Sequence, residues 1–159
     1  MGGGDQKETG MSTGTDALTR IRFIVPIKPI AQPRHRATAR GGFVRMYLPT
    51  DHPVQAFKQA IISEALKQKA PCIEGAVRLE LCFGFATEAS RRSKIMTYRI
   101  CRPDLDNLEK AVMDALTAAA VWNDDAQVAE KVSAKVAALS DFVAITIISL
   151  QPEVMNSNA

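Results

Sequence analysis

The sequence predicts an α+β fold: a single small domain in which a mixed β-sheet carries two helices on one face. Three observations predict it. The chain has 159 residues, enough for one hydrophobic core but not for several. Apolar residues alternate in some segments, as expected of strands, and recur with helical spacing at 53–69 and 104–120. The resulting order, β-β-α-β-α-β-β, is typical of a layered α+β domain.

The first half of the domain is expected to begin with a strand. In residues 20–25, Ile, Phe and Val alternate with other residues, two of them arginines, as in a half-buried strand. A loop broken by three prolines follows, and residues 43–48 are a short strand candidate. The helix at 53–69 is predicted from apolar residues that recur along one face: Val54, Phe57, Ile61 and Ala65.

The second half contains the clearest strand, 76–85, in which apolar and other residues alternate throughout. A long basic loop is expected at 87–103, followed by the helix at 104–120. Residues 127–139 fit either a helix or a strand, and we favour the strand. Residues 141–150 are apolar and β-branched, which predicts a buried strand.

The ends of the chain differ in composition from the domain predicted at 20–150. Residues 1–19 are rich in Gly, Ser, Thr and charge and are expected to form a disordered tail, and residues 151–159 are expected to be frayed. The N-terminus has neither an apolar run nor a basic start, so no signal peptide is predicted. No segment approaches the roughly 20 apolar residues of a membrane span. The three cysteines form no CxxC motif, and their odd number disfavours a disulfide framework, so we expect a reducing cytoplasm.

Charge is distributed unevenly along the chain. The net charge is +3, yet residues 1–103 carry 17 Lys and Arg against 8 Asp and Glu, whereas residues 104–159 carry 3 against 9. One basic run comprises Arg20, Arg22, Lys28, Arg34, Arg36, Arg40 and Arg45, and a second comprises Arg91, Arg92, Lys94, Arg99 and Arg102. A basic surface beside an acidic cluster suits a polyanionic partner held near a cation site, although ordinary solvated charge also explains such runs.

The acidic residues gather in RPDLDNLEKAVMDALTAAAVWNDD, residues 102–125. At 100° per residue, one face of the predicted helix carries its polar side chains, Asp106, Asn107, Lys110 and Asp114. Pro103 precedes the helix and Asp104 occupies the cap position, where an acid is favoured. A cap and an Asp106–Lys110 ion pair would explain these residues without any chemistry.

The Asp124–Asp125 pair lies just past the helix end, about 20 Å along the axis from its start. It can join the first aspartates only if the connection returns, or if the next strand places it beside them, and the sequence leaves this geometry open. Carboxylates gathered in one place repel one another unless a cation neutralises them. Oxygen ligands with no nearby His or Cys suit Mg²⁺ or Mn²⁺. The segment is not an EF-hand, and the chain has neither a P-loop nor a GxGxxG motif.

The pattern RPDLDNLEKAVMDAL…NDDAQV closely resembles the RusA family of Holliday-junction resolvases of bacteria and their phages. The family shows P-D-x-D-N-L-x-K-x-x-x-D-A-L followed by D-D-x-Q-[IV], and the spacing matches from Asp104 through Gln127. The resemblance extends loosely over residues 20–150. It does not cover the tail at 1–19 or the loop at 87–103, and Ala118 or Ala119 stands where the family often has Gly.

The resemblance implies a homodimeric, Mg²⁺-dependent endonuclease of DNA recombination and repair, cytoplasmic, that nicks two strands of a four-way junction symmetrically; Mn²⁺ is a possible substitute. It implies that Asp104, Asp106 and Asp125 bind the metal, so the fold is expected to bring the acidic turn back to the helix start. Lys110 is then the catalytic lysine. The supporting residues would be Asn107, Asp114 and Asp124, and the phosphate-binding residues Lys28, Arg34, Arg36 and Arg40.

Two other functions fit parts of the sequence. One is a basic, branched-DNA-binding dimer whose acidic cluster is structural and has no activity. The other is a metal-dependent transferase that uses the DxD pair, which the absence of a nucleotide-binding loop disfavours. Trp122 is expected to anchor the acidic turn to the core.

Overall fold

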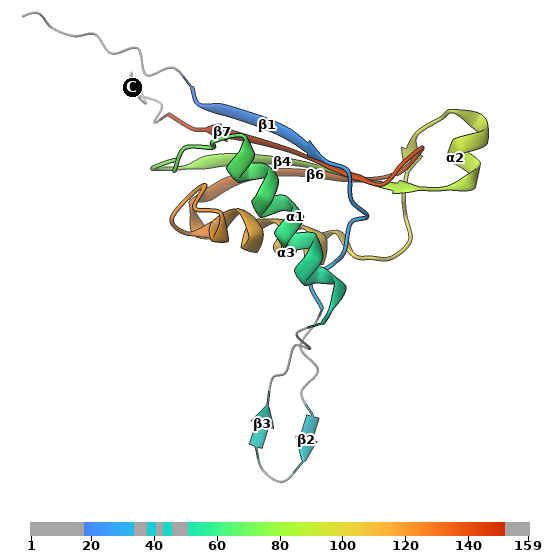
Figure 1. The fold of residues 1–159 in the computed structure, drawn as a ribbon, viewed down its shortest axis with the longest axis horizontal. Coiled ribbons are helices and arrows are strands. Elements are labelled where there is room, and N and C mark those ends of the chain that lie inside the picture. The colour runs from blue at the N-terminus through green and yellow to red at the C-terminus, as the bar shows by residue number, and fades with distance from the viewer. Residues whose placement is uncertain (1–17, 34–37, 41–42, 46–50, 152–159) are drawn as a thin grey trace, which may run out of the picture.

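The computed structural model describes residues 18–33, 38–40, 43–45 and 51–151, and confirms the α+β class. A mixed five-stranded sheet carries α1 (Pro53–Lys67) and α3 (Leu105–Ala118) on one face (Figure 1). The tail predicted at 1–19 and the end predicted at 151–159 lie almost wholly outside the described residues. Among the helices of the described ranges, none is long and apolar enough to cross a membrane.

The strands of the sheet lie in the order β1-β7-β4-β6-β5. Their bounds are Arg20–Val25 for β1, Val77–Ala86 for β4, Thr97–Tyr98 for β5, Val128–Ala138 for β6 and Phe142–Ser149 for β7. Only β4 and β6 run parallel, and the other neighbours are antiparallel. Because parallel neighbours need a long crossover connection, the chain between β4 and β6 has room for α3, which lies against the sheet.

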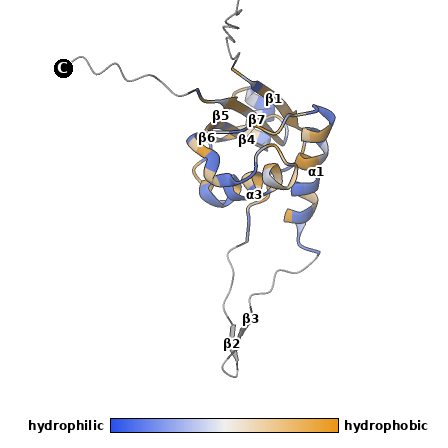
Figure 2. Ribbon diagram, turned by 90° about the vertical axis from the view of Figure 1, so that its left-hand side faces the viewer, coloured by the Kyte–Doolittle hydropathy of each residue, from blue (hydrophilic) through white to orange (hydrophobic). Residues whose placement is uncertain are grey.

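The core fills the space between the sheet and the two helices. α1 buries the four apolar residues that its spacing predicted, and α3 buries Leu108, Val112, Ala115 and Leu116. They pack against the inward-facing residues of β4 and β7, among them Leu79 and Ile147, which lie opposite each other in the register. Both helices lie together beneath the sheet and carry hydrophilic as well as hydrophobic residues (Figure 2). Glu109, on the inner side of α3, is 2.5 Å from Lys131 of β6, so an ion pair also ties this helix to the sheet.

Two predicted segments need correction. The strand expected at 43–48 is β3 (Phe43–Arg45), which pairs with β2 (Thr38–Arg40) in a separate two-stranded sheet; residues 46–48 lie outside the described ranges. The loop expected at 87–103 contains a short helix, α2 (Glu88–Ser93), and the strand β5. α2 is stabilised because its cap, Thr87, accepts a hydrogen bond from the Ser90 amide (3.1 Å). β5 forms because β6 offers it an edge.

No helix of the described chain covers the other face of the sheet, here called the open face (Figure 1). Side chains of four strands form a hollow there, among them Arg20, Arg22, Cys82, Ala134 and Thr146. Charge is concentrated at one end of this face, where Arg78 pairs with Glu80 (2.9 Å) and Glu130 (3.4 Å).

Candidate active site

Asp104 and Asp106 begin α3. Asp104 is the N-cap residue, with an extended backbone, and Asp106 lies in the first turn. Both are exposed, and the preceding Arg102–Pro103 peptide bond is cis. The free amides and the dipole at a helix N-terminus favour negative charge, so the start of α3 is a favourable position for two carboxylates.

The chain around the start of α3 is held from two sides. Lys135 of β6 donates from Nζ to the carbonyl oxygens of Cys101 (3.0 Å) and Pro103 (2.7 Å). On the other side, the amide of Gln32, in the loop after β1, donates to the carbonyl of Asn107 (2.9 Å). The position of the two aspartates is therefore set by contacts with remote parts of the chain. Sequence reasoning missed Lys135, because nothing local marks a strand lysine that binds carbonyls 32 and 34 residues away.

Lys110 lies one turn beyond Asp106 on the exposed side of α3. Its Nζ is 3.3 Å from Oδ1 of Asp114, and Oδ2 of the same carboxylate is 2.8 Å from Nζ of Lys58 in α1. Asp114 therefore links the two helices and also holds the lysine. Lys58 was missed because the pair spans two helices. The i,i+4 spacing pointed to Asp106 as a partner of Lys110, and the next acid along the same face, Asp114, has the same spacing.

The acidic turn is built as a cap. Asp124 is the N-cap of the 3-10 helix η1 (Asp125–Gln127), and its Oδ1 accepts a hydrogen bond from the amide of Ala126 (2.7 Å). The Gln127 side-chain oxygen accepts from the amides of Asn123 (2.8 Å) and Asp124 (3.2 Å). Asp124 and Gln127 together form a reciprocal capping box, which fixes the backbone that carries Asp125.

Two further contacts attach the turn to the rest of the fold. Gln127 Nε2 donates to the carbonyls of Ile73 (3.0 Å) and Gly75 (2.8 Å). Trp122 is buried and donates from Nε1 to Thr117 Oγ1 (2.7 Å), which confirms that it anchors the turn to the core. In the sequence, Gln127 stood out only because it occupies the glutamine position of the family motif. Its structural role depends on hydrogen bonds to residues more than 50 positions away, which the sequence does not show.

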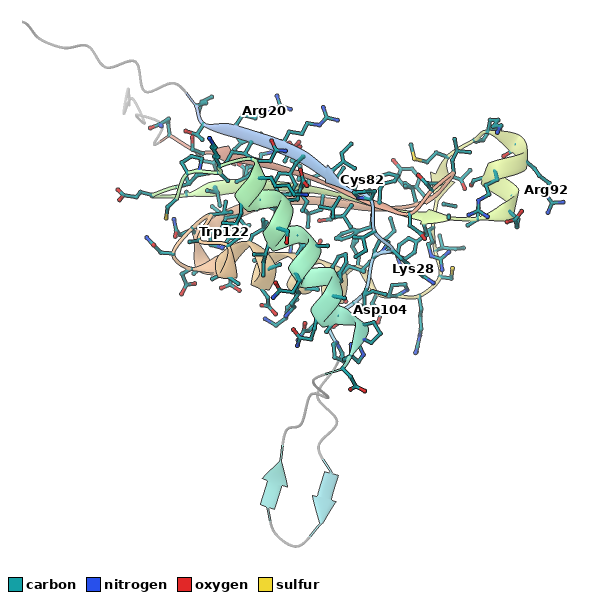
Figure 3. All side chains as sticks on the ribbon, viewed as in Figure 1. Arg20, Lys28, Cys82, Arg92, Asp104 and Trp122 are labelled. Atoms are coloured by element: carbon teal, nitrogen blue, oxygen red, sulfur yellow. The ribbon has the colours of Figure 1, made fainter. Side chains whose placement is uncertain are left out.

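The acidic turn lies at the opposite end of α3 from Asp104. The helix has 14 residues, or about 21 Å at 1.5 Å per residue. Asp124 and Asp125 border a shallow hollow with Asp114, Thr117 and Ala118, which belong to the C-terminal half of the helix. Figure 3 accordingly shows Trp122 and Asp104 at opposite ends of the helix layer.

The expectation that the turn returns to the helix start within one chain is not met. The turn stays beside the C-terminal half of α3, where Asp125 borders the same hollow as Thr117 and Ala118. It is β6 that runs back, so that its Lys135 reaches the carbonyl oxygens just before Asp104. Among the described residues, no three His, Cys, Asp or Glu side chains gather closely enough to hold a metal ion. One chain therefore brings Asp104, Asp106 and Lys110 together on α3 and leaves Asp125 apart.

Of the residues predicted to bind phosphate, Lys28 is exposed in the loop after β1. Arg34 and Arg36 lie outside the described residues, and only the backbone of Arg40, in β2, is described. The loop that contains Lys28 also contains Gln32, whose amide binds the first turn of α3, so the described part of this loop, residues 26–33, approaches the start of the helix.

Comparison with known protein families shows which family the chain belongs to. A family model described as endodeoxyribonuclease RusA matches residues 26–148. The chain belongs to the RusA family. The match spans α3, the acidic turn and most of the sheet, so the RusA resemblance drawn from the motif is confirmed. Among curated proteins, no match to the chain was found.

As a member of the RusA family, the chain is assigned to a group of endodeoxyribonucleases, enzymes that cut within DNA strands. The chemistry of its candidate site agrees with that class. Asp104 and Asp106 offer hard oxygen ligands, and Lys110 offers a positive charge on the same exposed side of α3. Oxygen ligands can hold a divalent cation, and such a cation and a lysine can both offset the negative charge of a phosphate.

Proposed function

We propose that the protein is a Mg²⁺-dependent endonuclease that resolves four-way DNA junctions by paired phosphodiester hydrolysis, as a homodimer acting in DNA recombination and repair. One observation carries the proposal. In a chain of the RusA endodeoxyribonuclease family, Asp104, Asp106 and Lys110 share the exposed side of one helix, next to a basic segment.

The donor set fits a magnesium ion. Mg²⁺ usually keeps several waters and binds through one or two carboxylates together with phosphate oxygens of the substrate, rather than through a full protein cage. Asp104 and Asp106 supply two carboxylates at an exposed helix start, where a phosphate could approach. Mn²⁺ has the same ligand preference and could substitute. When bound, the cation would activate a water and stabilise charge on the phosphate.

Lys110 would place its ammonium against the charge that develops on the phosphate or on the leaving oxygen. Asp114 supports it, because its carboxylate holds Lys110 on one oxygen and Lys58 on the other. Asn107 would orient an aspartate of the pair. Asp124, as the cap of η1, would position Asp125.

Asp125 would reach the acidic pair from a second copy of the chain. A two-fold axis that packs two α3 helices antiparallel brings the C-terminal end of each beside the N-terminal end of the other. Each copy then receives one Asp125 and donates one. Such a dimer has two complete sites, as two symmetric nicks require. The support for this step is the helix length that separates Asp125 from Asp104 within one chain.

DNA would be bound largely through its phosphates. Lys28 and the arginines 34, 36 and 40 are proposed to contact the backbone of the branches, which gives affinity that falls with salt and carries no sequence information.

The deciding experiment is cleavage of a labelled four-way junction beside a matched linear duplex, with Mg²⁺ or EDTA. Wild type is compared with Asp106→Asn, and with Lys110→Ala, for which we expect a rate about 10²–10³-fold lower. Paired Mg²⁺-dependent nicks at the junction, lost in Asp106→Asn while binding persists, are the expected result. Tight junction binding by wild type without cleavage under any divalent ion would instead leave a non-catalytic branched-DNA-binding protein.

A further inference from the structure

The segment between β4 and α3 exposes an apolar surface that is not used in the proposed chemistry. We call residues 87–100 the arm; it comprises α2, β5 and the residues around them. Its exposed apolar side chains are Ile95, Met96, Tyr98 and Ile100, and Tyr98 and Ile100 are 82% and 98% exposed. A group of large apolar side chains left in water marks an interaction surface rather than a packing error.

The backbone beneath these side chains is fixed. Tyr98 lies opposite Val136 in the β5–β6 ladder, and the amide of Arg99 donates to the Lys135 carbonyl (2.9 Å). Arg99 itself faces the core, with its guanidinium 4.6 Å from the centre of the Phe85 ring. Tyr98 is therefore held at the sheet edge with its ring in solvent, a geometry that costs little entropy when the ring binds a partner.

Tyr98 and Met96 also border a hollow of about 350 Å³ on the open face. Its other walls include Cys82, Ala134 and Val136, which are small or apolar. A flat apolar group lying against the Tyr98 ring would find room there and would meet no charged wall.

The charge of the arm identifies the class of partner. It contains four bases and one acid, Glu88. Arg91 forms an ion pair with Glu88 (2.6 Å). Arg99 lies over the Phe85 ring and donates a hydrogen bond to the Arg102 carbonyl (3.0 Å). Within the described structure, the side chains of Arg92 and Lys94 make no hydrogen bond or ion pair. Arg92 and Lys94 are therefore available to bind a partner, and they lie next to the exposed apolar side chains of the arm. Such a surface complements a polyanion that also presents flat apolar faces.

The arm lies at the same end of the sheet as the acidic pair. At its start, the amide of Thr87 donates to the carbonyl of Ala138. At its end, Lys135 holds the carbonyls of Cys101 and Pro103, directly before Asp104. Figure 3 shows Arg92 on α2, beyond this end of the sheet and opposite to Arg20. A DNA branch entering the site would pass the arm.

We propose that the arm recognises the branch point of the DNA: Tyr98 stacks on a base exposed there, and Arg92 and Lys94 bind the adjoining phosphates. This inference rests on the proposed function and adds the feature that distinguishes branched from linear DNA. Bases inside a duplex are stacked on both faces, whereas a branch point can present a free face. An aromatic ring stacks on any such base without sequence preference.

The test measures binding in the Asp106→Asn background, so that the DNA stays intact. A four-way junction and a linear duplex, each with 2-aminopurine at the same sequence position, report both affinity and stacking on that base. The variants are Tyr98→Ala, Tyr98→Phe as the control that keeps a ring, and Arg92→Ala with Lys94→Ala. The matched charge control is Arg20→Ala with Arg22→Ala, at the other end of the open face.

Tyr98→Ala is expected to weaken junction binding about tenfold and duplex binding less than about twofold, with loss of the 2-aminopurine change. Tyr98→Phe should match the parent. Removing Arg92 and Lys94 should lower the slope of log K against log salt by about two, and removing Arg20 and Arg22 should not. The proposal is overturned if Tyr98→Ala binds both DNAs as the parent does, or weakens both equally. It is also overturned if light scattering shows that Tyr98→Ala disrupts the dimer, which would make the arm an interface between copies.

Failure of the arm and failure of the proposed function give different results. If the chain with Asp106 intact cleaves junctions while Tyr98→Ala binds them normally, only the arm proposal fails. If the chain with Asp106 intact cleaves no junction, but Tyr98→Ala still reduces affinity for the junction and not for the duplex, the nuclease proposal fails and the arm proposal is supported.

Discussion

Lys58 of α1 and Asp114 of α3 form an ion pair of 2.8 Å across the helix interface. Both side chains are largely removed from water, with 15% and 27% of their surface exposed. The other oxygen of Asp114 is 3.3 Å from Lys110. The carboxylate therefore joins the packing of two helices to the position of the proposed catalytic lysine.

Replacing Asp114 by Asn should lower both stability and activity. We expect a loss of about 1–2 kcal/mol in the free energy of unfolding, because Lys58 loses its charged partner. Junction cleavage should slow by less than in Lys110→Ala, since the lysine remains but is no longer held. Single-turnover cleavage and urea unfolding measure the two effects. Lys58→Met is the control: it should destabilise similarly and cleave faster than Asp114→Asn. Equal rates for the two variants would show that Asp114 is only structural.

A shared site between two copies predicts rescue by mixing. Asp106→Asn and Asp125→Asn should each be inactive as homodimers. In a mixed dimer, one site combines Asp104 and Asp106 of one chain with Asp125 of the other and is intact. Unfolding and refolding the two variants together should therefore restore nicking of one strand, without the paired cut. A mixture that stays inactive, although mass spectrometry shows mixed dimers, would place all three aspartates of a working site in one chain.

Gln127→Leu should displace the acidic turn. The change removes the bonds to Ile73, Gly75, Asn123 and Asp124, of which only the bond to Ile73 is partly buried. Because water can replace the exposed bonds, we expect a loss of about 1 kcal/mol in stability, together with a rise in the Mg²⁺ concentration needed for cleavage. Gln68→Leu, whose side chain is exposed and bonds only Glu64 (2.9 Å), is the matched control and should change neither quantity appreciably. Unaltered Mg²⁺ dependence in Gln127→Leu would exclude Asp125 from the site.

The three thiols should differ in reactivity with pH. Burial raises the pKa of the Cys82 thiol, whereas Cys72 and Cys101 are exposed. Since the thiolate is the reacting form, a raised pKa leaves Cys82 protonated over a wider pH range and moves the rise in its alkylation rate to higher pH. Mass spectrometry after iodoacetamide treatment at pH 7.5–9 should show Cys82 modified last. In urea the three rates should converge; a difference that persists there would not come from burial.

Local patterns predicted the bounds of the helices and long strands to within a few residues, because apolar residues recur in the sequence with a period of 3.6 in a helix and 2 in a strand. β5 could not be predicted in this way: two residues carry no period, and Thr97 and Tyr98 become a strand only through pairing with Val136 and Ala137. The separation of β2–β3 from the main sheet, like the place of β7 between β1 and β4, also depends on pairing between distant segments.

In the candidate site, too, contacts within one helix could be predicted from the sequence and contacts between distant segments could not. Helical spacing predicted that Asp106 and Lys110 lie on one face of α3, and it set the axial distance to Asp125. It could not predict Lys58 or Lys135, whose partners lie 56 and up to 34 residues away. The turn was expected at the helix start because the family motif names Asp104, Asp106 and Asp125 without giving their arrangement. In the fold, the turn lies beside Thr117 and Ala118, at the other end of α3.

The arm occupies the crossover that joins the parallel strands β4 and β6, and it is attached at both ends to β6, at Ala138 and Lys135. Nothing between these attachments contributes a strand to the interior of the sheet. Evolution can therefore vary the length of this crossover, or replace it, without shifting the register of the five strands. Chimeras that exchange residues 87–100 between members of the family should fold alike and inherit the substrate preference of the donor.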